Sequence, residues 1–434
     1  MSKLTRRDFI KLFGAGAAAG TGLFGLTARA VAANAPHVVV LGGGIGGSTF
    51  AKYLRIADPN VRITLIERDA QYITCPRSND VIVGFHTLED ITFDHDTIRD
   101  KYDINVLIDE VAGVDADRRQ VRTAGGQNLS YDRLLVSPGI DFRWEAIDGY
   151  TPELADTRIP HAWKAGPQTL LLKQQLKNLP RGGRVLIAPP VDPFRCPPGP
   201  YERASMIAEY LQKHNPSAKV LILDPKDHFT KDGPFKKGWE RLYGYGTDNS
   251  LIEWVAGSEG GRILAVEPKN MTVEAEADRF QADLINIIPP QKAGKLAFAM
   301  GLTDSSGWCP VDRQTFESKK MPGVHVIGDA CIADEMPKSG YAANTQAKVA
   351  AWAISDLLNG RQPGEPTLSN TCYSLVGSRY GVSISSVYEL HEGHIRNVPD
   401  SGGLSPIDDN PARPVLEAVY QKNWHRTFVK DVFS

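Results

Sequence analysis

Residues 37–67 read HVVVLGGGIGGSTFAKYLRIADPNVRITLIE. A β-branched run, a small-residue segment and a second apolar run ending in Glu67 predict a strand, a helix and a strand. Between the first strand and the helix, Gly42, Gly44 and Gly47 keep the G-x-G-x-x-G spacing, which lets the backbone turn tightly beneath a pyrophosphate at the helix N-terminus. Glu67 stands twenty residues after Gly47, where an acid accepts hydrogen bonds from an adenosine ribose. The unit therefore predicts a dinucleotide site, and at this point FAD and NAD both fit it.

The first 35 residues precede this unit and predict an export signal. Arg6 and Arg7 stand in TRRDFIK, which is followed by a weakly apolar Gly/Ala-rich stretch and by small residues suited to signal peptidase. A membrane anchor is the weaker interpretation, because about 15 apolar residues fall short of the roughly 20 that a spanning helix needs. Twin-arginine export carries folded proteins, so we expect a periplasmic protein that receives its cofactor in the cytoplasm.

Length and composition narrow the remaining possibilities. The rest of the chain, about 400 residues, is long enough for two or three domains and has no further apolar run that could cross a bilayer. Removal of the predicted signal changes the formal net charge from −2 to −6, and a mildly acidic surface argues against a nucleic-acid partner and leaves room for a basic protein partner. An oxidising compartment permits disulfides, and five cysteines leave at least one without a partner inside the chain.

The segment after the first unit predicts the end of a dinucleotide domain. Alternating apolar and polar residues over 106–135 predict a β-meander with Gly125 and Gly126 at a turn. It closes on YDRLLVSPG at 131–139, an ending that marks the exit from the FAD domain in flavoproteins with two dinucleotide domains.

A second βαβ pattern follows, with strands at 184–188 and 219–223 and a helix near 203–214. The turn before the helix reads PPVDPFRCPPGP at 189–200, where a nucleotide-binding turn would carry glycines. Prolines lack N–H groups and have a fixed φ, so they prevent a tight phosphate loop. We therefore predict FAD at the first site and no NAD(P)H at the second.

The chain is predicted to return to the first domain near residues 283–289. The run VHVIGDA at 324–330 then ends an apolar strand in Gly-Asp, a second FAD signature in which Asp329 is placed to bond the ribitol. A helix over 342–358 follows, and its positive end would face the flavin. Residues 361–434, punctuated by glycine and proline, predict a third unit.

With these pieces in place, the whole mature length resembles the flavoprotein subunit of flavocytochrome c sulfide dehydrogenase. The resemblance rests on YITCPRSNDVIVGF (72–85), RCPPGPYERASMIAEYL (195–211), GDACIADEMPKSGYAANTQAKVAA (328–351), NTCYS (370–374) and SGGLSPID (401–408). It implies an α/β fold with two Rossmann-like domains, arranged as in glutathione reductase, and a C-terminal α+β interface domain. The predicted boundaries are 1–35 for the signal, 36–145 with 283–360 for the FAD-binding domain, 146–282 for the second domain and 361–434 for the interface domain.

The resemblance also assigns roles to three cysteines. Cys75 matches the family's flavin-linked cysteine, whose thioether to the flavin 8α carbon would hold FAD after export; a buried free thiol is the simpler alternative. Cys196 and Cys372 match the family's redox disulfide, although a structural disulfide or two unrelated thiols also fit two such residues. Glu202 matches an acid beside that disulfide and would handle protons, whereas by itself a Glu in a first helical turn more often stabilises the helix dipole.

Four further residues receive open assignments. Lys338 is expected to stabilise reduced flavin, with a solvated lysine as the alternative. Trp424 matches an aromatic near the family's flavin, and core packing explains it equally well. Cys309 and Cys331 have no family counterpart, so that both two buried thiols and an extra disulfide fit them. No metal site is predicted, and the chain contains no C-x-x-C-H, so haem c would reside only on a partner subunit.

The sequence thus predicts a periplasmic FAD enzyme that oxidises hydrosulfide through Cys196 and Cys372 and passes electrons to a c-type cytochrome subunit. A sulfide:quinone oxidoreductase is the first alternative, although residues 421–434 are short and mixed where that class usually ends in amphipathic, membrane-seating helices. A non-catalytic electron-transfer flavoprotein is the second alternative. An NADH-linked disulfide reductase is disfavoured by the proline-filled turn.

Overall fold

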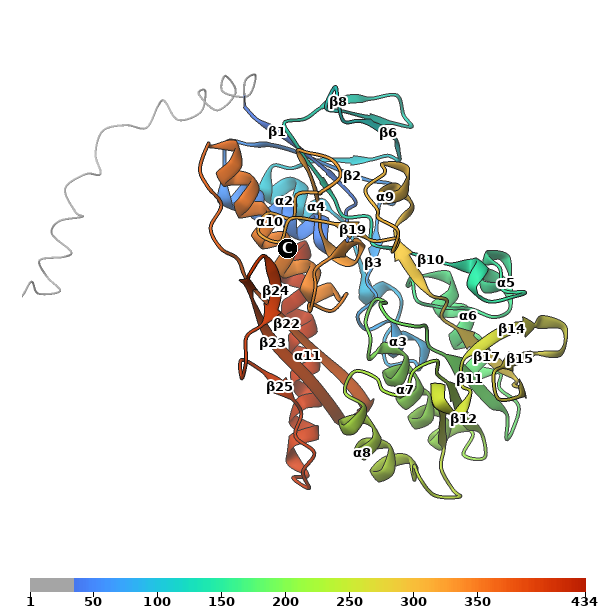
Figure 1. Cartoon of the computed structure of the whole chain (residues 1–434). Coiled ribbons are helices and arrows are strands. Elements are labelled where there is room, and N and C mark those ends of the chain that lie inside the picture. The colour runs from blue at the N-terminus through green and yellow to red at the C-terminus, as the bar shows by residue number, and fades with distance from the viewer. Residues whose placement is uncertain (1–34) are drawn as a thin grey trace, which may run out of the picture.

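The computed structural model describes residues 35–434, and its first sheet contains the predicted βαβ unit (Figure 1). Apart from residue 35, the predicted export signal lies outside the described residues. The sheet has the order β20-β9-β1-β2-β5, and its neighbouring strands run parallel. Its strands are β1 (His37–Leu41), β2 (Arg62–Glu67), β5 (Asn105–Ile108), β9 (Arg133–Val136) and β20 (Val324–Val326). Helices α2 (Ile45–Ala57) and α10 (Gly340–Leu358) pack together and share the core of this sheet.

A small antiparallel meander belongs to the same domain, and it is shorter than predicted. It consists of β6 (Val111–Asp115), β7 (Gln120–Thr123) and β8 (Asn128–Ser130). The two ends of the predicted segment, β5 and β9, join the parallel sheet instead. The apolar run of β9 is buried, as expected for a strand inside a sheet that is covered on both faces.

The second domain is built on a parallel sheet with the order β13-β12-β11-β17. Its strands are β11 (Arg184–Ala188), β12 (Lys219–Leu223), β13 (Ile252–Val255) and β17 (Leu284–Ile287), and α7 (Gly199–His214) connects β11 to β12. The predicted return to the first domain at residue 283 is wrong, because β17 pairs with β11 and ends the second sheet. β17 is a short, fully buried apolar strand. Such a strand has the same sequence pattern in either parallel sheet, so the pattern does not show to which sheet it belongs. Two parallel sheets with helices confirm the predicted α/β class.

The C-terminal domain combines an antiparallel sheet with one long helix. It contains β22 (Thr367–Gly377), β23 (Tyr380–His391), β24 (His394–Asn397), β25 (Gly403–Leu404) and α11 (Ala412–Phe433). The end of α11 is fixed to the first domain, where the Lys52 ammonium donates to the carbonyls of Asp431 at 2.9 Å and Ser434 at 2.6 Å. A cation at a helix C-terminus satisfies free carbonyls and complements the helix dipole. This domain therefore packs against the first domain beside its glycine loop helix α2.

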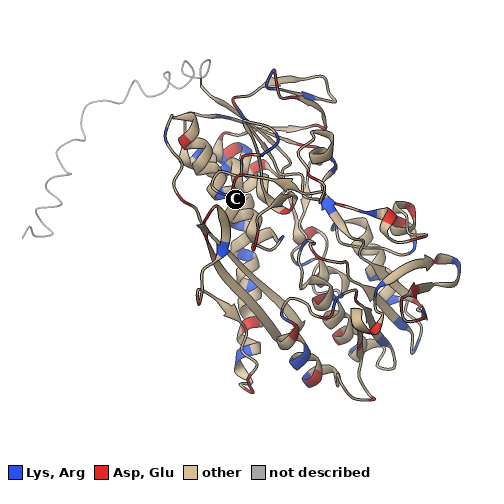
Figure 2. Cartoon of the chain, in the orientation of Figure 1, with Lys and Arg blue, Asp and Glu red and all other residues tan. Residues whose placement is uncertain are grey.

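Shorter elements connect these layers. The helices are α3 (Ser78–Ile82), α4 (Asp96–Tyr102), α5 (Pro152–Thr157), α6 (Pro167–Lys177), α8 (Asp232–Tyr243) and α9 (Lys295–Ala299). The strands are β3 (Tyr72–Ile73), β4 (Thr92–Phe93), β10 (Ile140–Phe142), β14 (Ile263–Glu267), β15 (Thr272–Ala275), β16 (Arg279–Gln281), β18 (Gln291–Ala293), β19 (Cys309–Pro310) and β21 (Cys331–Ile332). Charges of both signs are scattered over the described chain (Figure 2). Within residues 35–434, no helix has the length and apolar character needed to cross a membrane.

Candidate functional site

A cavity of about 1090 Å³ lies where the three domains meet. Residues from all three domains line it, among them Gly42, Glu67, Cys75 and Asp329 of the first, Cys196 and Glu202 of the second, and Cys372 and Trp424 of the third. This volume lies at the upper end of the range for small-molecule sites, as a long ligand such as a dinucleotide requires. The cavity therefore gathers most of the predicted site residues.

The glycine loop is shaped by close backbone approaches. Gly42 has φ +100°, and a Cβ there would stand 2.5 Å from the Ser137 carbonyl oxygen. A Cβ on Gly47 would stand 1.8 Å from the Gly42 carbonyl oxygen, so this glycine permits the close packing of α2 against β1. Gly42 and Gly44 line the cavity, whereas Gly47 lies behind them. The Glu67 carboxylate holds the loop in place by accepting a hydrogen bond of 2.5 Å from the Gly43 amide.

Two buried polar atoms beside the cavity have no partner among the described residues. They are Oδ1 of Asp329 and Nε1 of Trp424. Burial raises the pKa of Asp329, while Arg195 and Lys338 act against that shift. Buried polar atoms are normally hydrogen-bonded, so unpaired ones at a cavity wall indicate a polar ligand. Together with the glycine loop, these atoms fit FAD lying along the first domain.

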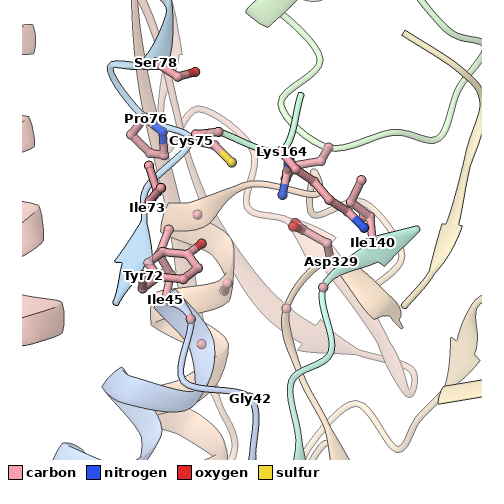
Figure 3. Close-up of a pocket in the computed structure, with 18 of the residues that line it drawn as sticks. Gly42, Ile45, Tyr72, Ile73, Cys75, Pro76, Ser78, Ile140, Lys164 and Asp329 are labelled. Atoms are coloured by element: carbon pink, nitrogen blue, oxygen red, sulfur yellow. The ribbon is translucent and has the colours of Figure 1, made fainter. Parts of the chain in front are cut away.

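Cys75 stands two residues after the end of β3, and its side chain is half-buried. Figure 3 shows its sulfur directed into the cavity, whose wall also carries Lys164 and Asp329. The thiol lies 3.5 Å from the Trp163 carbonyl oxygen, to which it donates a hydrogen bond. Pro76 restricts the backbone of Cys75 to an extended conformation, and the chain then turns at Arg77, with φ 72°, into α3. The cysteine is thus held within reach of a cofactor in this cavity.

The proline-rich turn after β11 carries Cys196 to the same cavity. Cys196 adopts φ 58°, and its amide donates to the Lys338 carbonyl oxygen at 2.7 Å. The neighbouring Arg195 bonds through its side chain to the Trp163 carbonyl oxygen. In a nucleotide-binding domain the corresponding turn would bind phosphate. Here the turn is hydrogen-bonded to other parts of the protein instead. Burial raises the pKa of Cys196, and nearby Cys372 and Glu202 add to that shift.

Cys372 reaches the cavity from the middle of β22, where it pairs with Ile384 of β23. It stands 176 positions from Cys196 in the sequence, yet both side chains line one cavity, and both are free thiols here. The Lys231 ammonium lies 3.5 Å from the Cys372 sulfur. The structure thus brings together the two cysteines that the sequence paired only by resemblance.

Glu202 links the two segments that carry these cysteines. It lies in the first turn of α7, and its carboxylate accepts from the Leu375 amide at 2.7 Å and from Asn79 Nδ2 at 3.1 Å. Burial raises its pKa, while the Leu375 amide and Lys231 act in the opposite direction. A carboxyl with a raised pKa that lines the same cavity as the two thiols is suited to proton transfer.

The structure places Lys338 behind the wall of the large cavity. This side chain does not line the large cavity; its ammonium donates to the carbonyl oxygens of Asp329 at 2.8 Å and Cys331 at 2.9 Å. It also lies over the Trp308 ring, 3.8 Å from the ring centre. Burial lowers its pKa, and Cys331 and Asp329 act against that shift. Lys338 therefore supports the loop behind Asp329, and its expected effect on reduced flavin stays a prediction.

Cys309 and Cys331 are direct partners in the two-stranded pairing of β19 with β21, and both are buried. Burial raises the pKa of Cys309 to about 12 and that of Cys331 to about 11. Both are free thiols in the structure and neither lines the large cavity. The other three cysteines, Cys75, Cys196 and Cys372, are half-buried and line the cavity.

Several residues of the site carry no sequence signal of their own. Arg195 and Lys231 lie beside Cys196 and Cys372. The ring of Tyr341 on α10 stacks with Trp424 and Phe428 of the third domain. For Arg195, the one available signal was that it directly precedes Cys196 in the sequence. Among residues 35–434, no group of three or more His, Cys, Asp or Glu is arranged to hold a metal ion.

Three family models match consecutive parts of the chain. They are "Pyridine nucleotide-disulphide oxidoreductase" over residues 36–165, "Sulfide dehydrogenase [flavocytochrome c] flavoprotein chain, central" over 169–289, and "Flavocytochrome c sulphide dehydrogenase, flavin-binding" over 364–433. A stretch of 45 residues is 54% identical to the sulfide dehydrogenase [flavocytochrome c] flavoprotein chain of Chlorobaculum thiosulfatiphilum, covering 94% of that sequence and 10% of this chain. The chain belongs to the flavocytochrome c sulfide dehydrogenase flavoprotein family. It is therefore a flavoprotein oxidoreductase of the class that oxidises sulfide, and FAD is its expected cofactor.

This member of the flavocytochrome c sulfide dehydrogenase family also resembles quinone-linked proteins. The sulfide-quinone reductase of Aquifex aeolicus is 24% identical over 371 residues, which cover 80% of this chain and 83% of that protein. The mitochondrial sulfide:quinone oxidoreductase of Mus musculus is 23% identical over 335 residues, 73% of this chain and 70% of that protein. The solved sulfide:quinone oxidoreductase of Aquifex aeolicus superposes with a TM-score of 0.69 at 19% identity, covering 92% of this chain and 91% of that one. This last likeness confirms the predicted two-domain flavoprotein fold.

Proposed function

We propose that this flavoprotein oxidises hydrosulfide to zero-valent or polymeric sulfur through a redox disulfide of Cys196 and Cys372. The observation that carries the proposal is the convergence of both cysteines, from different domains, on the cavity that holds the glycine loop. The unpaired Oδ1 of Asp329 in the same wall supports FAD as the neighbouring cofactor. Bound FAD would accept two electrons from the cysteine pair and release them one at a time.

The other residues of the cavity have separate tasks in this proposal. Gly42 and Gly44 let the backbone approach the pyrophosphate, and Asp329 accepts from the ribityl chain. Cys75 holds the flavin covalently, which would retain the cofactor outside the cytoplasm. Glu202 takes the proton that hydrosulfide or a thiol releases, because its carboxyl lies close to Cys196 and lines the same cavity as both cysteines.

The proposed electron acceptor is a c-type cytochrome subunit in the periplasm, reached by twin-arginine export. The basis is the family membership, the twin arginines at 6 and 7, and the lack of a C-x-x-C-H in the sequence. A quinone is the second candidate acceptor, since relatives named sulfide:quinone oxidoreductase match most of the chain. Steady-state assays with sulfide and either cytochrome c or a soluble quinone distinguish the two. Turnover with quinone alone would refute the cytochrome proposal.

Anaerobic titration of the holoprotein with sulfide tests the reaction itself. We expect the flavin absorption to bleach in the wild type and in a Cys309→Ala control, whose cysteine lies away from the cavity. The Cys196→Ser and Cys372→Ser variants should not bleach. Full bleaching in Cys372→Ser would refute the disulfide mechanism, and an unbleached wild type with intact FAD would favour a non-catalytic electron-transfer protein. Bleaching by NADH would instead indicate a pyridine-nucleotide reductase.

Mass spectrometry of the Cys75 peptide tests the covalent link. A flavin adduct on this peptide is the expected result, and it should be absent from a Cys75→Ala variant that still binds FAD. An unmodified Cys75 in flavin-loaded wild-type protein would refute the link.

A further inference from the structure

Lys231 is a buried cation placed directly against one of the two cavity cysteines. It is only 3% exposed and immediately precedes α8, which contacts β22 (Figure 1). Its ammonium donates to the Cys372 carbonyl oxygen at 3.1 Å, to the Ser374 hydroxyl at 2.9 Å and to the Cys372 sulfur at 3.5 Å. The backbone of Lys231 has φ 70°, a left-handed conformation that is uncommon for residues other than glycine. The fold thus holds this lysine in an unfavourable backbone conformation with its charge at Cys372.

Lys231 acts on the Glu202 carboxyl from a distance but has no carboxylate in direct contact among the described residues. Among residues 35–434, Lys231 takes part in no ion pair within 4.0 Å, and its direct contacts are a carbonyl, a hydroxyl and a sulfur. A buried ammonium is costly unless an anion accompanies it. Of its three direct contacts, only the sulfur of Cys372 can become an anion at moderate pH. The Lys231 ammonium is therefore placed to stabilise negative charge that develops on the Cys372 sulfur when a disulfide at this position opens.

The thiol of Cys196 lies in a different environment, in which burial has the largest effect. Burial, Cys372 and Glu202 all raise the pKa of its thiol, while Lys231 and Arg195 oppose this only as smaller influences. In thiol–disulfide exchange, the sulfur that leaves fastest is the one whose thiol has the lower pKa. The two halves of a Cys196–Cys372 disulfide are therefore not equivalent as leaving groups.

We infer that Lys231 sets the direction in which this disulfide opens, so that hydrosulfide attacks Cys196 and Cys372 leaves. In this step a bond forms between the sulfur of HS⁻ and Sγ of Cys196, while the Cys196–Cys372 bond breaks. Its electron pair stays on Cys372 as a thiolate paired with the Lys231 ammonium. The products are a persulfide on Cys196 and this thiolate; the step needs no further oxidant or reductant. The inference rests on the proposed function and makes Lys231 a catalytic residue, since it touches a reacting sulfur.

Trapping the opened disulfide tests the direction. Oxidised holoprotein is mixed anaerobically with one equivalent of sulfide, quenched with iodoacetamide and digested for peptide mass spectrometry. We expect the additional sulfur on the Cys196 peptide, in roughly tenfold excess or more, and direct alkylation of Cys372. In Lys231→Met this preference should fall towards equal labelling, whereas Lys231→Arg should retain it. Lys236→Met is the matched control, because Lys236 lies on α8 but faces Asp232 and the Trp254 ring.

Additional sulfur mainly on Cys372 in the wild type, or an unchanged ratio in Lys231→Met, would overturn the inference and leave the proposed function intact. Additional sulfur on neither peptide would refute the proposed function together with the inference. If a Lys231 variant fails to fold, alkylation rates in the wild-type protein still test the inference. In the reduced wild-type holoprotein, Cys372 should react with iodoacetamide about tenfold faster than Cys196 near neutral pH, and the reverse order would also overturn the inference.

Discussion

The backbone amide of Leu375 donates a hydrogen bond of 2.7 Å to Oε1 of Glu202. Leu375 follows Cys372 by three residues on β22, and Glu202 follows Cys196 by six at the start of α7. One carboxylate thus fastens together the two segments that bring the cysteines to the cavity. Its burial raises the pKa of Glu202, so the carboxyl retains a proton to higher pH than an exposed Glu would. Glu202 therefore both joins the two segments and can hold or release a proton at the cavity.

Replacing Glu202 by Gln should separate these two roles. The amide keeps an acceptor for Leu375, so we expect a folded protein with bound FAD. It has no ionisable group, so the rate of flavin bleaching by sulfide should fall roughly 100-fold. Stopped-flow bleaching over a range of pH would measure this. The wild-type profile should contain an ionisation above the ordinary Glu value, with the rate rising as the carboxyl loses its proton, and Glu202→Gln should lack it.

Glu209→Gln is the control for this experiment. Glu209 lies on the same helix and also binds the third domain, accepting from the Ser378 amide at 2.7 Å, but it does not line the cavity. A loss of activity in Glu209→Gln equal to that in Glu202→Gln would mean that both residues act only by joining α7 to β22.

Asp329 should determine how tightly FAD binds without a covalent link. We expect Asp329→Ala in a Cys75→Ala background to weaken FAD binding roughly 10- to 100-fold, the effect of losing a hydrogen bond to a charged group. Fluorescence titration of the flavin-free protein with FAD measures the dissociation constant. Glu335→Ala is the matched control, because Glu335 lies on the same segment but pairs with Arg396 away from the cavity. Equal dissociation constants for the Asp329 variant and its parent would show that the unpaired oxygen does not face the cofactor.

Local sequence patterns correctly predicted features that are determined by residues close together in the sequence. The glycine spacing at 42–47 gave the first βαβ unit, and the prolines at 189–200 indicated that the second turn holds no phosphate. The Glu202–Leu375 bond joins positions 173 apart, and no periodicity or propensity reports such a contact. The direction of the Lys338 side chain was missed for a related reason. A lysine after a Pro reads as exposed, and only the fold shows the two carbonyls and the Trp308 ring that surround it.

The buried thiols of Cys309 and Cys331 should lower stability at alkaline pH. Their pKa values are raised from 9.0 to about 12 and about 11, so the unfolded chain loses these protons at a lower pH than the folded one. Their contribution to the free energy of unfolding is therefore complete below about pH 9 and is lost as the pH rises towards the folded values. Urea unfolding from pH 8 to 10.5 should show a steeper loss in wild type than in a Cys309→Ala, Cys331→Ala double variant. Parallel curves, or a disulfide between the two in non-reduced peptide maps, would contradict this prediction.

Lys338→Met should destabilise the protein without changing the flavin. The substitution leaves the carbonyls of Asp329 and Cys331 without their donor inside a buried loop, and an unsatisfied buried group costs about 1–3 kcal/mol. The melting temperature should therefore fall, while the flavin spectrum and the reduction potential stay close to those of the wild type, because Lys338 does not line the cavity. Lys164→Met supplies the contrast, since Lys164 lines the cavity (Figure 3), and its loss should shift the flavin spectrum. A large change in potential in Lys338→Met at unchanged stability would restore the role that its position in the sequence suggested, a cation acting on the reduced flavin.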